Sequence, residues 1–115
     1  MGKAGKRRNR HVATHLAEMA RIDKKRFHFE WNRRLDGWLA EINRRAKLLR
    51  VDKAHELASK RVFGVLEHVN ELLAQCGPDV EALVGASTRD TITHECCKAL
   101  ALAVAPNLYR LTTKA

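Results

Sequence analysis

The sequence predicts an all-α protein, a small helical bundle of three to four helices built on an antiparallel helical hairpin. The first observation behind this prediction is the scarcity of helix breakers, since the 115 residues include only two prolines and six glycines. The second is that apolar residues recur every three or four positions, which is the period of one face of an α-helix. A chain of this length fits one domain with one hydrophobic core.

The region from His11 to Leu49 has the profile of a helix, with no proline and one glycine, Gly37. Asp23 is a candidate N-cap inside it, so the sequence leaves open whether the region is one helix or two. Downstream of Asp23 the apolar residues share one helical face and predict a core seam. The seam consists of Phe27, Trp31, Leu35, Trp38, Ile42 and Leu49.

A second long helix is predicted over residues 53–76. Asp52 is its candidate N-cap, and Gly77 followed by Pro78 ends it. So short a connection between the two long helices favours antiparallel packing. The apolar stripe of the second helix is formed by Ala54, Ala58, Val62, Val65, Val69, Leu72, Leu73 and Cys76.

A last helix is predicted to follow a short helix over residues 78–84 and a break at Gly85, Ala86 and Ser87. Ser87 with Asp90 resembles a capping box at its start. Its apolar residues cover a wide arc, so we expect this helix to be the most buried. It runs to about Ala105, because Pro106 cannot continue it.

The ends of the chain differ from the middle. Residues 1–10 hold five bases, no acid and no large apolar residue after Met1, which predicts a disordered basic arm. Residues 11–105 are then the helical domain, and residues 106–115 are a C-terminal tail.

Charge is divided unevenly along the chain. Residues 1–61 hold 18 of the 22 Lys and Arg against seven of the 13 Asp and Glu, a net charge of +11. Residues 62–115 hold the other four bases and six acids, a net charge of −2. A basic half joined to a mildly acidic, apolar half is typical of a protein in which the basic half binds a polyanion and the apolar half forms packing contacts.

Candidate binding residues come from the basic arm and from the side of the first long helical region that faces away from the seam. Arginine forms bidentate hydrogen bonds to phosphate, the small residues Gly37 and Ala40 leave room for close approach, and Phe29 offers a ring on which an unpaired base can stack. The candidate set is Lys3, Lys6, Arg7, Arg8, Arg10, Lys24, Lys25, Arg26, Phe29, Arg33, Arg44 and Lys47. The alternative interpretation is a solvated helix face, with Glu30–Arg34 and Glu41–Arg45 spaced as i,i+4 ion pairs.

These features predict a non-catalytic nucleic-acid-binding protein that contacts the phosphates of RNA or DNA independently of sequence. It would act as a small subunit of a ribonucleoprotein or nucleoprotein complex. In size, helicity and basic character the chain is similar to small helical subunits of prokaryotic ribonucleoprotein effectors such as CRISPR complexes, without a shared motif. A helix-turn-helix DNA reader is less favoured, because the sequence shows no recognition-helix pattern. The competing class is a protein-interaction module, an adaptor or inhibitor whose basic half docks an acidic partner.

A protein partner or self-association is also expected. Phe29 and Phe63 both lie off the predicted apolar seams, and burying an aromatic ring is worth roughly 1.5–3 kcal/mol. We therefore expect at least one of these rings to lie at a contact with another chain or with nucleic acid.

We expect neither a metal nor a cofactor, and the sequence carries no catalytic signature. His94 and Cys97 are three residues apart, and Cys76 or Cys96 would have to supply further ligands, but two properly spaced pairs are missing. The three cysteines cannot all pair within one chain, which suits a reducing compartment. With no apolar stretch of membrane-spanning length and no secretory signal, the expected location is cytoplasmic, with no membrane partner.

Overall fold

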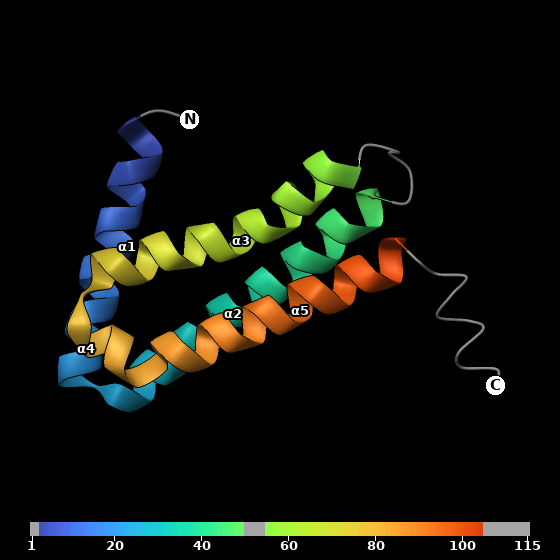
Figure 1. Ribbon diagram of the computed structural model, residues 1–115. Coiled ribbons are helices and arrows are strands. Elements are labelled where there is room, and N and C mark those ends of the chain that lie inside the picture. Colours follow the sequence, from blue (N-terminus) through green and yellow to red (C-terminus); the bar gives the residue numbers. More distant parts are fainter. Residues whose placement is uncertain (1–2, 50–54, 105–115) are drawn as a thin grey trace.

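The computed structural model describes the backbone of residues 3–49 and 55–104, and the side chains of residues 10–49 and 59–103. Four main helices follow one another: α1 (Lys3–Ile22), α2 (Lys24–Leu48), α3 (His55–Cys76) and α5 (Ala86–Val104). The short α4 (Pro78–Val80) and a π-helical turn, η1 (Glu81–Gly85), connect α3 to α5 (Figure 1). No strand occurs within these ranges, so the predicted all-α class is confirmed.

Asp23 separates α1 from α2, which answers the question of one helix or two. Its backbone leaves the helical region at φ −144° and ψ 87°, and its carboxylate Oδ1 accepts a hydrogen bond from the backbone N–H of Arg26 at 3.2 Å. This is the geometry of an N-cap, because the side chain satisfies an N–H that has no partner within the first turn. The change of direction at Asp23 lets α1 cross the bundle instead of extending α2.

The start of α1 differs from the disordered arm predicted for residues 1–10. The backbone is helical from Lys3 onward, so residues 3–10 extend the helix that begins the domain. The physical reason is that alanine, lysine and arginine are strong helix formers, and no proline separates them from the apolar stripe that packs at Ala13 and Leu16.

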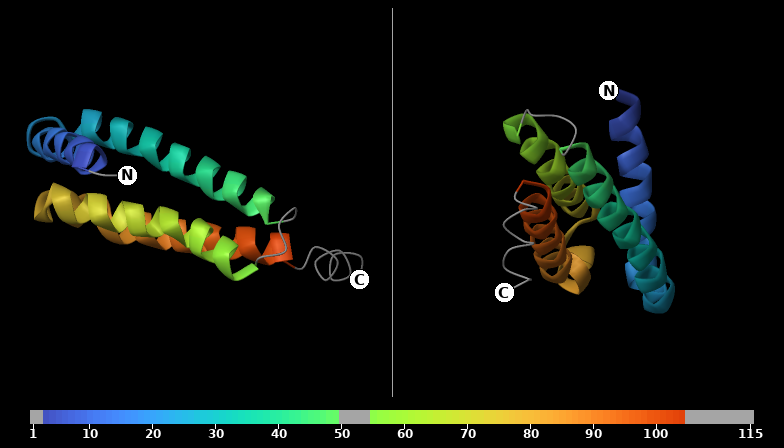
Figure 2. Two further views of the ribbon diagram at one scale, coloured as in Figure 1. Left: turned by 90° about the horizontal axis from the view of Figure 1, so that it is seen from above. Right: turned by 90° about the vertical axis from the view of Figure 1, so that its right-hand side faces the viewer.

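The helices form two layers. Figure 2 shows α1 and α2 on one side of the molecule and α3 and α5 on the other, with α1 crossing one end of the bundle. The principal-axis extents of 52 × 35 × 18 Å describe a flat body of that thickness. Because α2 packs on both α3 and α5, its inner face is covered and its opposite face is left on the outside of the slab.

The core lies between these layers along the predicted seams. Phe27, Trp31 and Ile42 of α2 are fully buried, while Leu35 and Trp38 are half-buried against the same core. The stripe of α3 from Val62 to Cys76 is buried as predicted, at Val62, Val65, Val69, Leu72, Leu73 and Cys76. Asp52, Ala54 and Ala58 lie outside the residues whose side chains are described.

The expectation that the last helix is the most buried was wrong. Cys97 and Ala101 of α5 are exposed, because α5 packs on α2 and α3 along one side only. The central helix is α3, which contacts α1, α2, α4, η1 and α5. No described helix has the length and apolar character needed to cross a membrane.

The chain between α3 and α5 shows one confirmed prediction and one correction. Gly77 ends α3 at φ +94°, a conformation that glycine adopts without strain. The predicted break at Gly85 and Ser87, with its capping box, is wrong: η1 runs directly into α5, with Ala86 helical at φ −63° and ψ −48°. Ser87 Oγ instead donates to the backbone carbonyl of Val84 at 3.3 Å.

Gly85 lies within η1, where the absence of a side chain leaves room for the carboxyl group of Glu81. A Cβ on Gly85 would lie 2.5 Å from the Glu81 carboxyl group. That carboxylate pairs with the guanidinium of Arg89, whose Nε also donates to Asn70 on α3 at 2.8 Å. The hydrogen bond from Arg89 lowers the pKa of Glu81. Through these contacts Arg89 of α5 connects Glu81 of η1 to Asn70 of α3.

Candidate functional site

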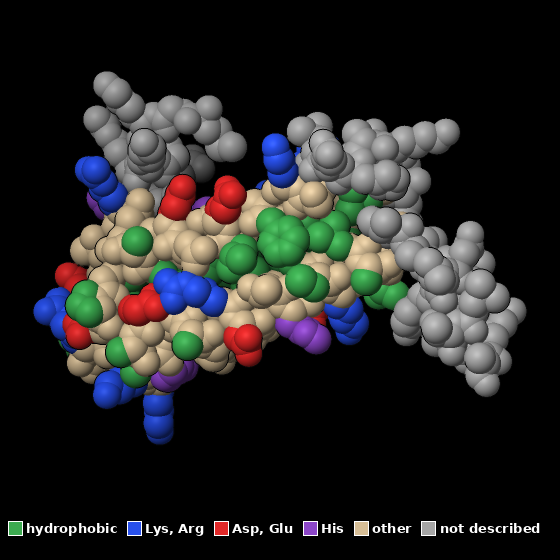
Figure 3. All heavy atoms as spheres, in the orientation of Figure 1, with side chains coloured by type: hydrophobic (Ala, Val, Ile, Leu, Met, Phe, Trp, Pro, Cys, Tyr) green, Lys and Arg blue, Asp and Glu red, His purple; other side chains and the backbone are tan. Residues whose placement is uncertain are grey.

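The two layers carry charge of opposite sign. Residues 3–48, which form α1 and α2, hold 14 Lys and Arg against five Asp and Glu, a net charge of +9. Residues 55–104, which form α3 to α5, hold four bases against seven acids, a net charge of −3. On the face formed by α3 and α5, apolar side chains gather between the helices and charges of both signs are scattered around them (Figure 3). The positive charge is therefore concentrated on the other layer.

Within the basic layer, an exposed row of side chains runs along the outer side of α2, opposite its buried seam. At 3.6 residues per turn these side chains fall within an arc of about 60°. All are exposed, and Phe29 is the most prominent apolar one, with 62% of its surface accessible. We call this row the α2 ridge: Arg26, Phe29, Arg33, Arg44 and Lys47.

The middle of the α2 ridge is low, as the sequence predicted. Gly37 and Ala40 are both exposed, and a Cβ added at Gly37 would meet no atom within 4 Å. A flat partner can therefore rest against the helix backbone between Arg33 and Arg44. This small-residue stretch permits close approach but supplies no binding group of its own.

The other candidate residues are only partly located. Lys24 and Lys25 are exposed at the start of α2, beside Arg26, and Arg10 is exposed on α1. The side chains of Lys3, Lys6, Arg7 and Arg8 lie outside the described residues, and their backbone belongs to the first turns of α1. The candidates that the structure brings together are those of α2.

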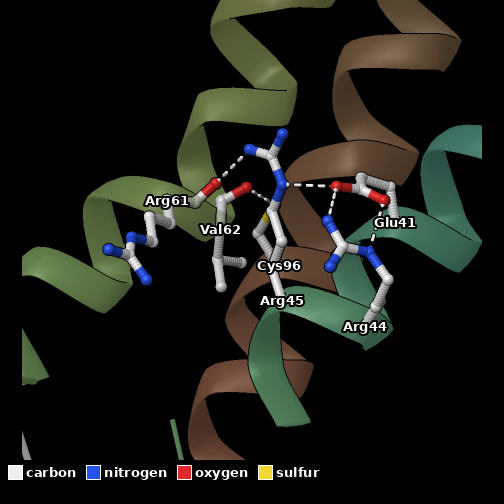
Figure 4. A network of polar contacts seen from close by, with 6 residues as sticks. All are labelled: Glu41, Arg44, Arg45, Arg61, Val62 and Cys96. Carbon is white, nitrogen blue, oxygen red and sulfur yellow. Dashed lines mark hydrogen bonds and ion pairs between the residues drawn. The ribbon is translucent and has the colours of Figure 1, made fainter. Parts of the chain in front are cut away.

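The two ends of the α2 ridge differ in how their charges are engaged. At the carboxyl end, Glu41 binds both neighbouring arginines: Arg44 Nε donates to Glu41 Oε2 at 2.9 Å, and Arg45 Nε donates to Glu41 Oε1 at 2.8 Å (Figure 4). Hydrogen bonds from Arg44 and Arg45 lower the pKa of Glu41 to about 2. Arg44 therefore has a carboxylate partner already, which reduces the charge that it can offer to a ligand.

Arg45 ties this network to the second layer. Its guanidinium donates to the backbone carbonyl of Arg61 on α3 at 2.6 Å (Figure 4). The guanidinium passes over Gly64, where an added Cβ would lie 3.2 Å from it. The predicted Glu41–Arg45 pair thus has a structural role, because it holds α2 against α3. The predicted Glu30–Arg34 pair is not formed between these described side chains.

At the amino end of the ridge the bases have no acidic partner. Lys24, Lys25, Arg26 and Arg33 make no ion pair with any described residue. The acid that precedes them, Asp23, has its carboxylate directed to the backbone N–H of Arg26 as the N-cap. Glu30 and Asp36, each three residues from Arg33, form no ion pair with it. We call Lys25, Arg26, Phe29 and Arg33 the Phe29 end. It combines one exposed ring with three bases that form no ion pair with a described residue.

A hollow of about 280 Å³ lies beside the Phe29 end, lined by Glu30, Arg33 and Arg34. Its carboxylate lining is unfavourable for an anion. The Nε of Arg34 is buried there without a hydrogen-bond partner. The exposed bases of the ridge, and not this hollow, are the better place for a phosphate.

Of the two aromatic residues predicted to lie off the seams, only Phe29 is mostly exposed. Phe63 is half-buried and packs against the core. Two other large apolar side chains are exposed, Ile22 at 81% and Leu48 at 46% of their surfaces. Ile22 ends α1 close to the Phe29 end in sequence.

The cysteines and histidines do not form a site in the described part of the chain. Cys76 and Cys96 are buried and Cys97 is exposed, all as free thiols. Burial raises the pKa of Cys76 and of Cys96 to about 11. Among the described residues, no group of three or more His, Cys, Asp and Glu side chains is arranged to hold a metal ion.

Comparisons of the chain with protein-family models, with curated proteins and with solved structures find no match.

Proposed function

We propose that this protein binds nucleic acid through sequence-independent phosphate contacts made by the Phe29 end of α2, as a small subunit of a nucleoprotein complex. The observation that carries the proposal is that Lys25, Arg26 and Arg33 are exposed on the positively charged layer and form no ion pair with any described residue. Cations without partners on a rigid helix are ready to neutralise phosphates and release their counterions.

The chemistry of these residues favours a phosphate backbone over an acidic protein surface. Arginine matches phosphate with two parallel hydrogen bonds, and such contacts fix a nucleic acid in place without reading its sequence. Phe29 gives the same surface an aromatic group, which nucleic acid can use through base stacking. An acidic protein partner would have to supply a matching pocket for the ring in addition to its acids, whereas every nucleobase has a face that can stack on it.

The test compares two double variants that remove the same charge from the two ends of the ridge. In Arg26→Ala/Arg33→Ala both lost arginines are unpaired, whereas Arg44→Ala/Lys47→Ala removes one arginine that Glu41 already engages. Binding is measured by fluorescence anisotropy with labelled RNA and DNA over a series of salt concentrations. Circular dichroism checks that helicity is unchanged, as expected for exposed positions.

We expect the first double variant to bind about tenfold more weakly and to lower the slope of log affinity against log salt by about 2, one for each lost phosphate contact. The second should change affinity by less than about threefold, because Glu41 already engages Arg44 and only Lys47 is lost as a base without an ion pair to a described residue. Equal losses from both ends would show that only total charge matters. If the wild-type protein binds no nucleic acid even at low salt, the proposal is wrong and an acidic protein partner becomes the better explanation.

A further inference from the structure

We propose that the nucleic acid bound at the Phe29 end is single-stranded, with one unpaired base stacked on the Phe29 ring and the flanking phosphates held by Arg26 and Arg33. This inference rests on the proposed function and narrows its ligand. It names a contact to the base as well as to the backbone, and it excludes a regular duplex as the preferred partner.

The first step is that Phe29 is set apart from the other aromatic side chains. The aromatic contacts among described residues link Phe27, His28, Trp31, Trp38 and His68. Phe29 is in none of them, and 62% of its surface is accessible. Its neighbour Phe27 fills the core, so the packing of the bundle does not require a second phenylalanine facing outward.

The second step is the position of the ring between two unpaired guanidinium groups. Arg26 precedes Phe29 by three residues and Arg33 follows it by four, so both lie next to the ring on the helix surface, with Cβ atoms about 5–6 Å away. A strand that lays one base on the ring continues in both directions toward an arginine. Each arginine can then bind the phosphate on its side of the stacked base.

The third step distinguishes a single strand from a duplex. In a duplex both faces of each base are covered by neighbouring bases, so an exposed ring meets only sugar and phosphate. A single strand offers uncovered base faces, which stack on aromatic side chains whatever the sequence. A helix that reads a duplex instead places Arg, Asn or Gln against base edges in the major groove. The centre of the α2 ridge has Gly37 and Ala40, with the exposed Asp36 beside them, and none of these is an arginine, asparagine or glutamine that could make such contacts to base edges along a duplex.

An anionic membrane surface would also attract exposed apolar groups among bases, but the structure favours it less. Interfacial helices bind lipid with a continuous apolar face. Here the apolar face of α2 is buried in the core, and the exposed large apolar side chains among the described residues, Ile22, Phe29 and Leu48, are separate from one another and form no continuous face. A flat ring between two arginines fits one base better than it fits a lipid layer.

The experiment measures the affinity of the full chain for fluorescein-labelled oligothymidine of about 16 nucleotides, the upper end of site sizes for a small single-strand-binding fold, and for a blunt duplex of equal length. The variants are Phe29→Leu, which keeps an apolar side chain without a ring, and Phe29→Tyr, which keeps the ring. The matched control is Leu48→Ala, another exposed apolar position on α2. Because both positions are exposed, circular dichroism should show unchanged folding for all three variants.

We expect the wild type to prefer the single strand over the duplex by at least about fivefold, and Phe29→Leu to lose at least about fivefold on the single strand, as for one lost stacking contact. The loss on the duplex should stay below about twofold, and Phe29→Tyr and Leu48→Ala should bind like the wild type. Equal or tighter duplex binding, or a silent Phe29→Leu substitution while Arg26 and Arg33 are still required, would overturn the single-strand inference and leave the proposed function standing. If the protein binds neither the single strand nor the duplex, both the single-strand inference and the proposed function are wrong. Phe29-dependent sedimentation with phosphatidylserine vesicles, without oligonucleotide binding, would assign the ring to a lipid surface.

Discussion

The indole Nε1 of Trp31 donates a hydrogen bond to the hydroxyl Oγ1 of Thr88 at 2.9 Å inside the core, and so joins α2 to the first turn of α5. Thr88 is the one polar residue among the buried side chains that the structure describes, with 2% of its surface accessible. A buried indole N–H needs a partner. Thr88 can accept this hydrogen bond because α5, which continues directly from η1, begins with Thr88 facing the Trp31 ring.

Replacing Thr88 with Val should lower the free energy of unfolding by about 1–3 kcal/mol, because the Trp31 N–H is left buried without an acceptor. In a Trp31→Phe background the same replacement should have a much smaller effect, since that N–H is already gone. Thr88→Ser, which keeps the hydroxyl, is the control. Urea denaturation of the four proteins of this double-mutant cycle measures the coupling. Additive effects would show that the hydrogen bond adds nothing to stability.

Two glycines should respond in opposite directions to the same change. Gly37 lies on the open side of α2 with no neighbour, so Gly37→Ala should raise the free energy of unfolding by about 0.5–1 kcal/mol through helix propensity. Gly77 adopts φ +94°, so Gly77→Ala should lower it by about 1 kcal/mol or more, although space is free around it. Thermal unfolding of both variants checks the signs. A stabilising Gly77→Ala would mean that α3 does not end there as described.

Neutralising Glu41 should strengthen binding to polyanions. Glu41→Gln removes the carboxylate that engages Arg44, so the carboxyl end of the α2 ridge gains an uncompensated guanidinium. Glu67→Gln, an exposed position on α3, makes the same change in net charge on the other layer and is the control. We expect Glu41→Gln to bind oligonucleotides about two- to fivefold more tightly, in line with about one added phosphate contact. Equal effects of the two variants in anisotropy titrations would show that only the net charge of the protein, and not the release of Arg44, changes the affinity.

The same carboxylate should give an acid-sensitive contribution to stability. The pKa of Glu41 is lowered in the folded protein from 4.5 to about 2 by hydrogen bonds from Arg44 and Arg45. Its stabilising effect is therefore complete above about pH 4.5 and is lost as the pH falls toward 2. The difference in Tm between wild type and Glu41→Gln should be largest near neutral pH and should shrink through this window. A constant difference from pH 7 to pH 2 would contradict the Arg44 and Arg45 contacts.

One of the three thiols should react quickly in the native protein. Cys97 is exposed, whereas Cys76 and Cys96 are buried and have pKa values raised to about 11 by burial. At pH 8 the two buried thiols are protonated and shielded, which suppresses attack on a thiol reagent. Titration with a chromogenic disulfide should give one rapid equivalent, and three after denaturation. Loss of the rapid equivalent in Cys97→Ser identifies it, and two rapid equivalents in the native wild type would show that a buried cysteine is accessible.

The helices and their buried faces could be predicted from the sequence because they depend on local periodicity. The seam from Phe27 to Ile42 and the stripe from Val62 to Cys76 recur at helical spacing, and Asp23 and Gly77 are residues whose chemistry favours helix ends. The η1 turn could not be predicted in this way. Gly85 is a residue type that commonly ends helices, and the sequence does not show that the carboxyl group of Glu81, paired with Arg89, packs against it.

The candidate site was predicted as one uniform basic stripe, and its division into two ends was missed. Glu41 stands three residues before Arg44 and four before Arg45, so the spacing of both pairs can be read in the sequence. What cannot be read is that Arg45 turns toward Arg61 on α3 while Arg44 stays on the outer side with Glu41. The partial burial of Phe63 likewise depends on how the helices pack against one another, which local periodicity does not give.

The opposite charges of the two layers give the molecule a permanent electric dipole across its thinnest dimension. In the field of any polyanion such a body experiences a torque as well as an attraction, and the torque acts before the surfaces touch. It turns the α1 and α2 layer forward during diffusion and the α3 and α5 layer to the rear. Fewer collisions are then lost to wrong orientation, and added salt shortens the distance over which this alignment operates.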